Sequence, residues 1–183
     1  KAVRAFLARV NGDVVDDPVA IKVAALLKGK RDVILDLVAR AGRHARTLQS
    51  RDLEFVLCHY DIHAGNVLID AATDALYIVD WDDPILAPKE RDLMFVGGGI
   101  GGAWNTPQEE ALFYQGYGPA EIDPVALAYY RYERIVEDIA VYCEQLLLTD
   151  EGGQDREQSY QYLRSNFLPN ETIEIAHRSD TTL

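Results

Sequence analysis

Helical periodicity dominates the hydrophobic pattern of this chain. Arg31 to Leu48 carries apolar residues at spacings of three and four, which predicts an amphipathic helix. Upstream, Asp17-Pro18 supplies a cap and a first-turn proline, so another helix is expected to begin there. The 52 residues that precede Leu53 therefore read as helices, and no small β-sheet can be drawn in them.

The second half of the chain repeats this helical pattern. Thr106-Pro107-Gln108-Glu109 has the form of a capping box and predicts a helix that runs to Gly116. Asp123-Pro124 caps the longest predicted helix, whose apolar stripe reaches Leu147 and which Glu151-Gly152-Gly153 ends. Ser159 to Phe167 is amphipathic again, and Pro169-Asn170 breaks the pattern before a short last helix or tail. Lys89 to Val96 also looks helical.

Short β-branched and aromatic runs lie between these helices. Leu53 to Cys58 predicts a buried strand. Asn66 to Asp70 and Leu76 to Asp80 flank a five-residue connection and predict a β-hairpin. Because a hairpin returns its second strand to the start of the first, we expect Asn66 and Asp80 to lie side by side.

Composition and charge narrow the class of protein. The 183 residues suffice for one core, so residues 1–183 are expected to form a single domain. No apolar run approaches the roughly 20 residues that span a bilayer. With 18 Lys and Arg against 30 Asp and Glu, the net charge of −12 disfavours nucleic acid and favours a cationic small molecule as partner. Two cysteines, Cys58 and Cys143, give no disulfide framework, so we expect them to pack in the core of a cytoplasmic protein.

The residues with the most distinctive chemistry follow the predicted buried strand. In the run His59-Tyr60-Asp61-Ile62-His63-Ala64-Gly65-Asn66, Asp61 and Asn66 stand five apart, and Asp80 follows fourteen residues later in Val79-Asp80-Trp81. Phosphoryl transfer from ATP needs a carboxylate that receives the proton of the acceptor hydroxyl, and oxygen ligands for Mg²⁺. The order and spacing match: Asp61 is the predicted base, and Asn66 and Asp80 are the predicted metal ligands.

These motifs resemble the aminoglycoside phosphotransferase and choline kinase superfamily, whose members carry H-x-D-x-H-x-x-N followed by I/V-D-W or I/V-D-F. The stretches Trp81 to Pro84, Ala87 to Phe95 and Tyr130 to Ala140 look most like its spectinomycin phosphotransferase subgroup. The resemblance implies an α+β, mainly α-helical fold, namely the C-terminal lobe of the protein-kinase-like fold with a small hairpin carrying the metal ligands. It also implies ATP as phosphate donor, Mg²⁺ as cofactor, and a hydroxyl of an aminocyclitol or aminoglycoside antibiotic as acceptor. The N-terminal ATP-binding lobe is expected to be absent from the chain.

Other residues receive supporting roles. His59, His63 and Asp92 are expected to support the catalytic loop, and Trp81 to lie in the core. Five charged residues are expected at the rim of the acceptor pocket: Asp82, Asp83, Arg134, Glu137 and Asp138. The alternative for the helix is structural, because Arg131, Arg134 and Asp138 are spaced to form an ion-pair network on one face.

Several alternatives stay open. His59-x-Asp61-x-His63 would share one face of a strand, as metallohydrolase ligands do, but such a site needs further ligands and the chain has four histidines. Gly97 to Gly102 contains G-x-G-x-x-G, yet it follows the catalytic loop, so it is interpreted as a flexible connection bordering the acceptor site. A kinase of choline, homoserine or a methylthio-sugar, and a non-catalytic binding module, remain the competing functions.

Overall fold

The structure of the chain is a computed structural model that describes residues 1–12, 17–100, 104–149, 152–153 and 155–180. Its helices are α1 (Ala2–Arg9), α2 (Pro18–Gly29), α3 (Arg31–Gln49), α4 (Glu90–Leu93), α5 (Pro107–Tyr117), α6 (Pro124–Leu148), α7 (Asp155–Ser165) and α8 (Thr172–Ser179). Its strands are β1 (Val56–Cys58), β2 (Val67–Asp70), β3 (Ala75–Ile78) and β4 (Ile85–Ala87), and Ala64–Asn66 forms a 3₁₀ turn.

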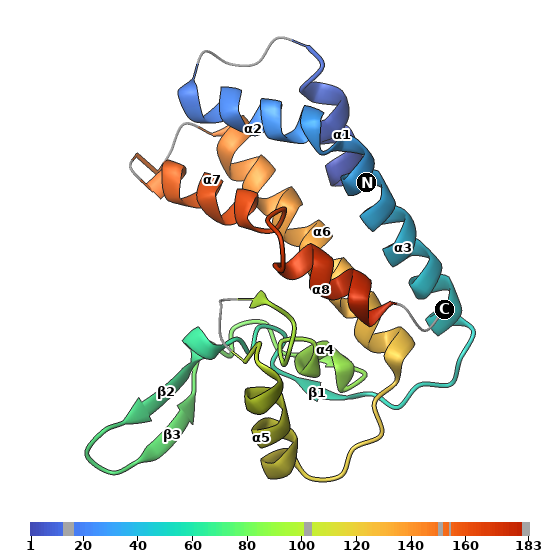
Figure 1. Ribbon diagram of the computed structural model, residues 1–183, viewed down its shortest axis with the longest axis vertical. Coiled ribbons are helices and arrows are strands. Elements are labelled where there is room, and N and C mark those ends of the chain that lie inside the picture. The colour runs from blue at the N-terminus through green and yellow to red at the C-terminus, as the bar shows by residue number, and fades with distance from the viewer. Residues whose placement is uncertain (13–16, 101–103, 150–151, 154, 181–183) are drawn as a thin grey trace.

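Helix α6 is the central element of the molecule. It begins where the Asp123 carboxylate accepts hydrogen bonds from the backbone N–H groups of Val125 and Ala126, next to a proline at the first helical position. Helix α3 packs along it, α1 and α2 cover one end, and α7 and α8 lie along its other side (Figure 1). The side chains that meet there form the main core, among them Leu27, Ile34, Leu37, Ile139, Cys143 and Leu146.

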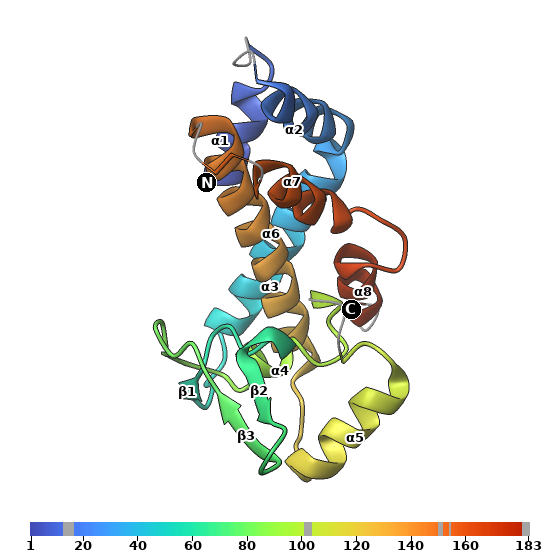
Figure 2. The same ribbon diagram turned by 90° about the vertical axis from the view of Figure 1, so that its left-hand side faces the viewer.

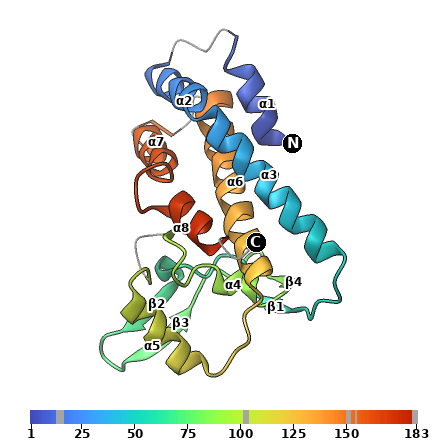
Figure 3. The same cartoon turned by 45° about the vertical axis from the view of Figure 1, so that its right-hand side comes forward.

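The lower part of the molecule contains two small sheets and helices α4 and α5 (Figure 2). Strand β1 pairs antiparallel with β4, and β2 pairs antiparallel with β3 in the hairpin. Figure 3 shows the β1–β4 pair beneath the lower ends of α3 and α6. A second cluster of buried side chains joins this pair to α6 and includes Cys58, Ala87, Met94, Phe95 and Tyr130. The segment that links β1 to β2 is therefore supported by this second cluster of buried side chains.

Most predicted elements are confirmed. The fold is mainly α-helical with small antiparallel sheets, and both hydrogen bonds of the capping box at Thr106 are present. The hairpin forms with Val67 opposite Ile78. Asp70 pairs with Ala75, so the connection has four residues instead of five. Asn66 lies in the 3₁₀ turn that leads into β2.

Other expectations need correction. Strand β4 was not predicted, and the helix expected over Lys89 to Val96 is only the short α4. Trp81 is 47% exposed instead of lying in the core. Helix α6 ends at Leu148. Glu151, which was expected to help end it, and Gly101 and Gly102 of the glycine run lie outside the described residues.

Two predictions drawn from composition can also be compared with the structure. Cys58 and Cys143 are both buried and unpaired, as expected. Within the described ranges, no helix combines the length and the apolar character that crossing a bilayer requires.

Candidate active site

A carboxylate on α4 holds the loop that follows β1. The backbone N–H groups of His59 and Tyr60 donate to the two carboxylate oxygens of Asp92, at 2.8 and 3.0 Å. Charge-assisted hydrogen bonds of this kind are among the stronger ones in proteins. Asp92 therefore fixes the start of the loop against α4, in the position expected of a supporting residue.

His59 joins the same loop to the end of the hairpin. Its Nε2 lies 2.8 Å from the backbone oxygen of Val79, and its Nδ1 accepts a hydrogen bond from the N–H of Asp61 at 3.3 Å. An acceptor Nδ1 requires the proton on Nε2, so the two contacts define one tautomer. The ring is buried and packs 4.5 Å from the ring of Trp81. Because both ring nitrogens have partners, His59 is not placed to bind a metal.

The hairpin brings the two predicted metal ligands to the catalytic loop. The Asn66 amide nitrogen donates to the backbone oxygen of Asp61 at 2.8 Å and lies 3.5 Å from Oδ2 of Asp80. The N–H of Val79 donates to the backbone oxygen of Asn66, which extends the strand pairing to the open end of the hairpin. Asp80 has a φ of +68°, a left-handed conformation uncommon outside glycine. Asp61, Asn66 and Asp80 thus converge as predicted.

The Asp61 side chain is one-third exposed and lies between two basic groups. Its Oδ1 accepts a hydrogen bond from Nη1 of Arg134 at 2.7 Å, and its Oδ2 lies 3.8 Å from Nε2 of His63. The N–H of Gly65 donates to Nδ1 of His63, so this ring is also held within the loop. The carboxylate is therefore oriented by neighbours and still open to solvent.

Arg134 bridges two carboxylates. Besides Asp61, it contacts Oδ1 of Asp138 through Nε at 2.9 Å, one helical turn further along α6. Burial raises the pKa of Asp138 to about 6, although the nearby guanidinium opposes the shift. Burial alone would lower the pKa of Arg134, but Asp138 and Asp61 hold it above its ordinary value. The intrahelical ion pair expected from the spacing therefore exists, and it also reaches the catalytic loop.

A cavity of about 450 Å³ opens beside this bridge. Its wall combines His63 of the loop, Arg134 and Asp138 of α6, Ile100 of the glycine run, and side chains of α7 and α8. Gly99 also lines it, which agrees with the interpretation of the glycine run as a border of the acceptor site. Two carboxylates line this cavity, Asp138, which is paired with Arg134, and Glu171.

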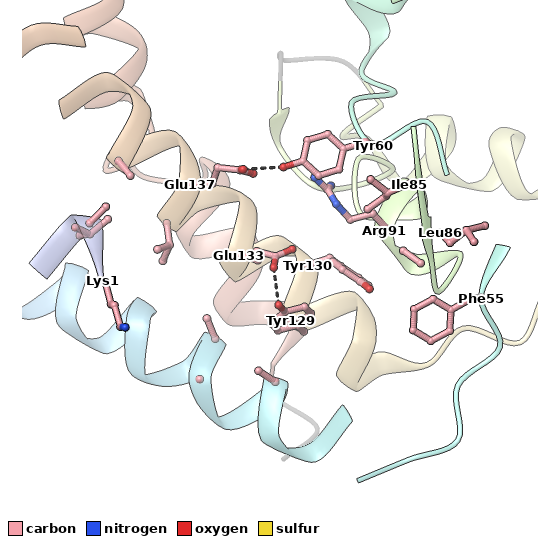
Figure 4. Close-up of a pocket in the computed structure, with 18 residues that line it drawn as sticks. Lys1, Phe55, Tyr60, Ile85, Leu86, Arg91, Tyr129, Tyr130, Glu133 and Glu137 are labelled. Atoms are coloured by element: carbon pink, nitrogen blue, oxygen red, sulfur yellow. Dashed lines mark hydrogen bonds between the residues drawn. The ribbon is translucent and has the colours of Figure 1, made fainter. Parts of the chain in front are cut away.

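A second cavity, of about 580 Å³, lies on the other side of the catalytic loop (Figure 4). Here the Tyr60 hydroxyl donates to Glu137 at 2.7 Å, and the buried Arg91 guanidinium packs 3.9 Å from the Tyr60 ring. Burial and the neighbouring Glu137 raise the pKa of Tyr60. Glu137 therefore holds the loop through Tyr60. It lines this second cavity, whereas Asp138 lines the first one. The remaining predicted rim residues, Asp82 and Asp83, are exposed and line neither cavity.

Comparison with known proteins identifies the family. The sequence model of the phosphotransferase enzyme family matches residues 6–130. The chain belongs to the phosphotransferase enzyme family. Two crystal structures of spectinomycin phosphotransferase, APH(9)-Ia, are similar to it. The complex with ADP and spectinomycin has a TM-score of 0.88 and 44% identity over 98% of this chain. The AMP-bound complex has a TM-score of 0.85 and 45% identity over 96%.

The similarity covers only part of the length of these two phosphotransferases. The chain spans 54% of the length of each matched structure. No curated protein matches the chain. The family and the lobe-like fold are thus established over nearly all of this chain, while the matched phosphotransferases contain further residues beyond the region of similarity.

The donor atoms of this phosphotransferase site fit magnesium better than zinc. Both N–H groups of the Asn66 amide point to oxygen atoms, of Asp61 and Asp80, which leaves the amide carbonyl as the ligand atom. An amide oxygen beside a carboxylate suits Mg²⁺, which keeps several waters and binds phosphate oxygens. Among the described residues, no group of three or more His, Cys, Asp or Glu side chains could hold a metal. The engaged ring nitrogens of His59 argue against the metallohydrolase alternative.

Several residues around the cavity beside Arg134 were not predicted. Tyr142 continues the helical spacing of Arg134 and Asp138 at four-residue steps, so that periodicity could have identified it. Tyr162, Asn166 and Glu171 come from α7, α8 and their connection. No local pattern marks them, because only the packing of α7 and α8 against α6 brings them to the cavity.

Proposed function

We propose that this chain is the catalytic and acceptor-binding lobe of an ATP-dependent phosphotransferase, acting on a hydroxyl of an aminocyclitol antibiotic such as spectinomycin. The observation that carries the proposal is the position of the Asp61 carboxylate. The carboxylate pairs with Arg134, which lines a cavity together with Asp138 and Glu171. The backbone oxygen of Asp61 accepts a hydrogen bond from the Asn66 amide, which also lies 3.5 Å from Oδ2 of Asp80. The similarity to structures of spectinomycin phosphotransferase with ADP and spectinomycin supports the same acceptor.

In this proposal Asp61 receives the proton of the acceptor hydroxyl. The acceptor oxygen forms a bond to the γ-phosphorus of ATP while the bond from that phosphorus to the bridging oxygen of ADP breaks, and the proton moves to the Asp61 carboxylate. Asn66 and Asp80 would hold Mg²⁺, which neutralises phosphate charge during such transfers. Asp92 and His59 keep the loop fixed, so that the carboxylate does not need to reorient at the moment of transfer.

The charge of the cavity supports a cationic acceptor. Protonated amines are attracted by the carboxylates of Asp138 and Glu171, which line the same cavity as His63. The formal charge of −12 adds a long-range field of the same sign. Asp82 and Asp83, exposed after the hairpin, are proposed to add to this field at the entrance and not to contact the acceptor directly.

The remaining grip on ATP is proposed to come from outside the described residues. The segments before β1 are the helices α1, α2 and α3, and none supplies the strand-borne lysine and glycine-rich loop that kinase-like enzymes place over the phosphates. We propose that residues 1–183 act as one unit that holds the base, the metal ligands and the acceptor cavity. The use of ATP and the two unpaired cysteines fit a cytoplasmic location.

The test is acceptor-dependent ATP turnover by the complete gene product in the presence of Mg²⁺. Spectinomycin should stimulate ADP formation more than choline, homoserine or a methylthio-sugar does. Asp61→Asn should reduce kcat by about 100-fold or more, because general-base catalysis contributes that much, while nucleotide affinity stays near that of the wild type. Asp80→Asn should instead weaken binding of Mg²⁺ and nucleotide. Asp74→Asn, at the exposed tip of the hairpin, is the matched control and should leave turnover unchanged.

The alternatives give different results in the same assay. Stimulation by another hydroxyl compound but not by spectinomycin would indicate a small-metabolite kinase. Absence of turnover with every acceptor, combined with tight acceptor binding, would indicate a non-catalytic module. Near wild-type turnover of Asp61→Asn would remove Asp61 from the proposed role.

A further inference from the structure

We propose that Arg134 is a positioning residue for the catalytic carboxylate, and that it does not bind the acceptor. The inference rests on the proposed function of Asp61 as the group that receives the hydroxyl proton. It assigns to Arg134 the task of holding one carboxylate oxygen so that the other faces the acceptor. Two sets of contacts and one argument from charge lead to this assignment.

The first set concerns Asp61 itself. Its side chain extends from a loop, is 33% exposed, and follows Tyr60, whose φ of +81° is uncommon for a residue other than glycine. A carboxylate on such a loop has rotational freedom unless a neighbour restricts it. Nη1 of Arg134 contacts Oδ1 at 2.7 Å, so Oδ2, on the side of His63, is the oxygen left for the acceptor hydroxyl.

The second set concerns the rigidity of Arg134. Its Nε contacts Asp138 at 2.9 Å, its guanidinium carbon lies 5.7 Å from the centre of the Phe95 ring, and its side chain is 17% exposed. It also extends from α6, the central helix of the fold. A planar guanidinium fixed at two nitrogens is a more exact support than a flexible ammonium. Functional groups held from a helix in this way keep their geometry better than groups on loops.

The third argument is the charge of the acceptor. A guanidinium repels the protonated amines of an aminocyclitol, so Arg134 is a poor ligand for such a molecule. The carboxylate of Glu171 lines the same cavity and has the sign that attracts these amines. The positive charge of Arg134 is compensated within the protein, by Asp61 on one side and Asp138 on the other. Its contacts therefore serve the catalytic loop.

Steady-state kinetics of the complete gene product separate a positioning role from acceptor binding. We expect Arg134→Gln to lower kcat by about tenfold to a hundredfold, the range that small misplacements of a catalytic group produce. The KM for spectinomycin should change by less than about threefold. Arg134→Lys should recover part of kcat, since it restores the charge but cannot span both carboxylates. Arg178→Gln, the same change at a side chain 59% exposed on α8, is the matched control and should leave both constants unchanged.

A double-mutant cycle in urea unfolding tests the contact without any turnover. Arg134→Gln and Asp61→Asn, alone and together, should show a coupling of about fivefold or more in the unfolding equilibrium constant, as expected for residues in direct contact. Additive effects, or an unchanged kcat with a raised acceptor KM, would overturn the positioning role. Failure of the proposed function gives a different signature, namely a wild-type protein without spectinomycin-stimulated turnover in which the coupling persists.

Discussion

Replacing Asp138 by asparagine should change how stability depends on pH. Asp138 is partly buried on α6, with 24% of its side chain exposed, and it pairs with Arg134. Burial first, and then the charges of Glu137 and Asp61, raise its pKa from the ordinary 3.8 to about 6 in spite of this pair. Each tenfold change in proton affinity corresponds to about 1.36 kcal/mol, so the displacement amounts to about 3 kcal/mol.

The sign follows from proton linkage. Between about pH 4 and pH 6 the folded protein keeps the Asp138 proton while the unfolded chain has released it, so the free energy of unfolding falls as the pH rises through this window. Asp138→Asn removes this contribution. Urea unfolding at pH 4 and pH 7.5 should show the variant gaining about 3 kcal/mol relative to the wild type between the two values. The comparison at pH 4, where residue 138 is neutral in both folded proteins, is the internal control. A difference that stays constant within about 1 kcal/mol would refute the burial argument.

Three further substitutions test the packing and the buried hydrogen bonds of the fold. Gly98→Ala should destabilise the fold by about 2 kcal/mol or more in urea unfolding, because its Cβ would lie 2.1 Å from the backbone oxygen of Met94. Gly116→Ala in α5, where nothing lies within 4 Å, should stabilise by about 0.5 kcal/mol, and equal effects of the two changes would contradict this reasoning. Asp180→Asn should cost about 2 to 3 kcal/mol at pH 7, because the carboxylate accepts hydrogen bonds from Arg40 at 2.6 Å and Tyr132 at 2.9 Å. Although burial opposes it, these bonds lower the pKa of Asp180, so the wild type loses this stability as the pH falls below about 4 and the deficit of the variant should shrink at pH 3.

Elements whose signals are local were predictable from the sequence. The capping box at Thr106 and the caps at Asp17 and Asp123 depend on residues within three positions, and all three helices begin where expected. The hairpin was predictable for the same reason, and with it the meeting of Asn66 and Asp80. Strand β4 was not, because it has three residues and pairs with β1 across 29 positions without any periodic pattern of its own.

The proposed acceptor site was only partly predictable because neighbours in sequence diverge in space. Consecutive residues on a helix point about 100° apart, so Glu137 contacts Tyr60 while Asp138 lines the proposed acceptor cavity. Arg131 shares the spacing of the ion-pair network, yet its guanidinium turns to the backbone oxygens of Met94 and Val96. Helical spacing shows which residues share a face, and tertiary packing decides what that face meets.

The hairpin separates the two proposed metal ligands, Asn66 and Asp80, from its own tip. Both oxygen donors flank the open end, where Val79 bonds to Asn66, while the turn closed by Asp70 and Thr73 lies at the far end of the two strands. Insertions at that turn would lengthen an exposed loop and leave the donor pair in register. If Asn66 and Asp80 hold the metal as proposed, the tip can change in length and composition without moving them.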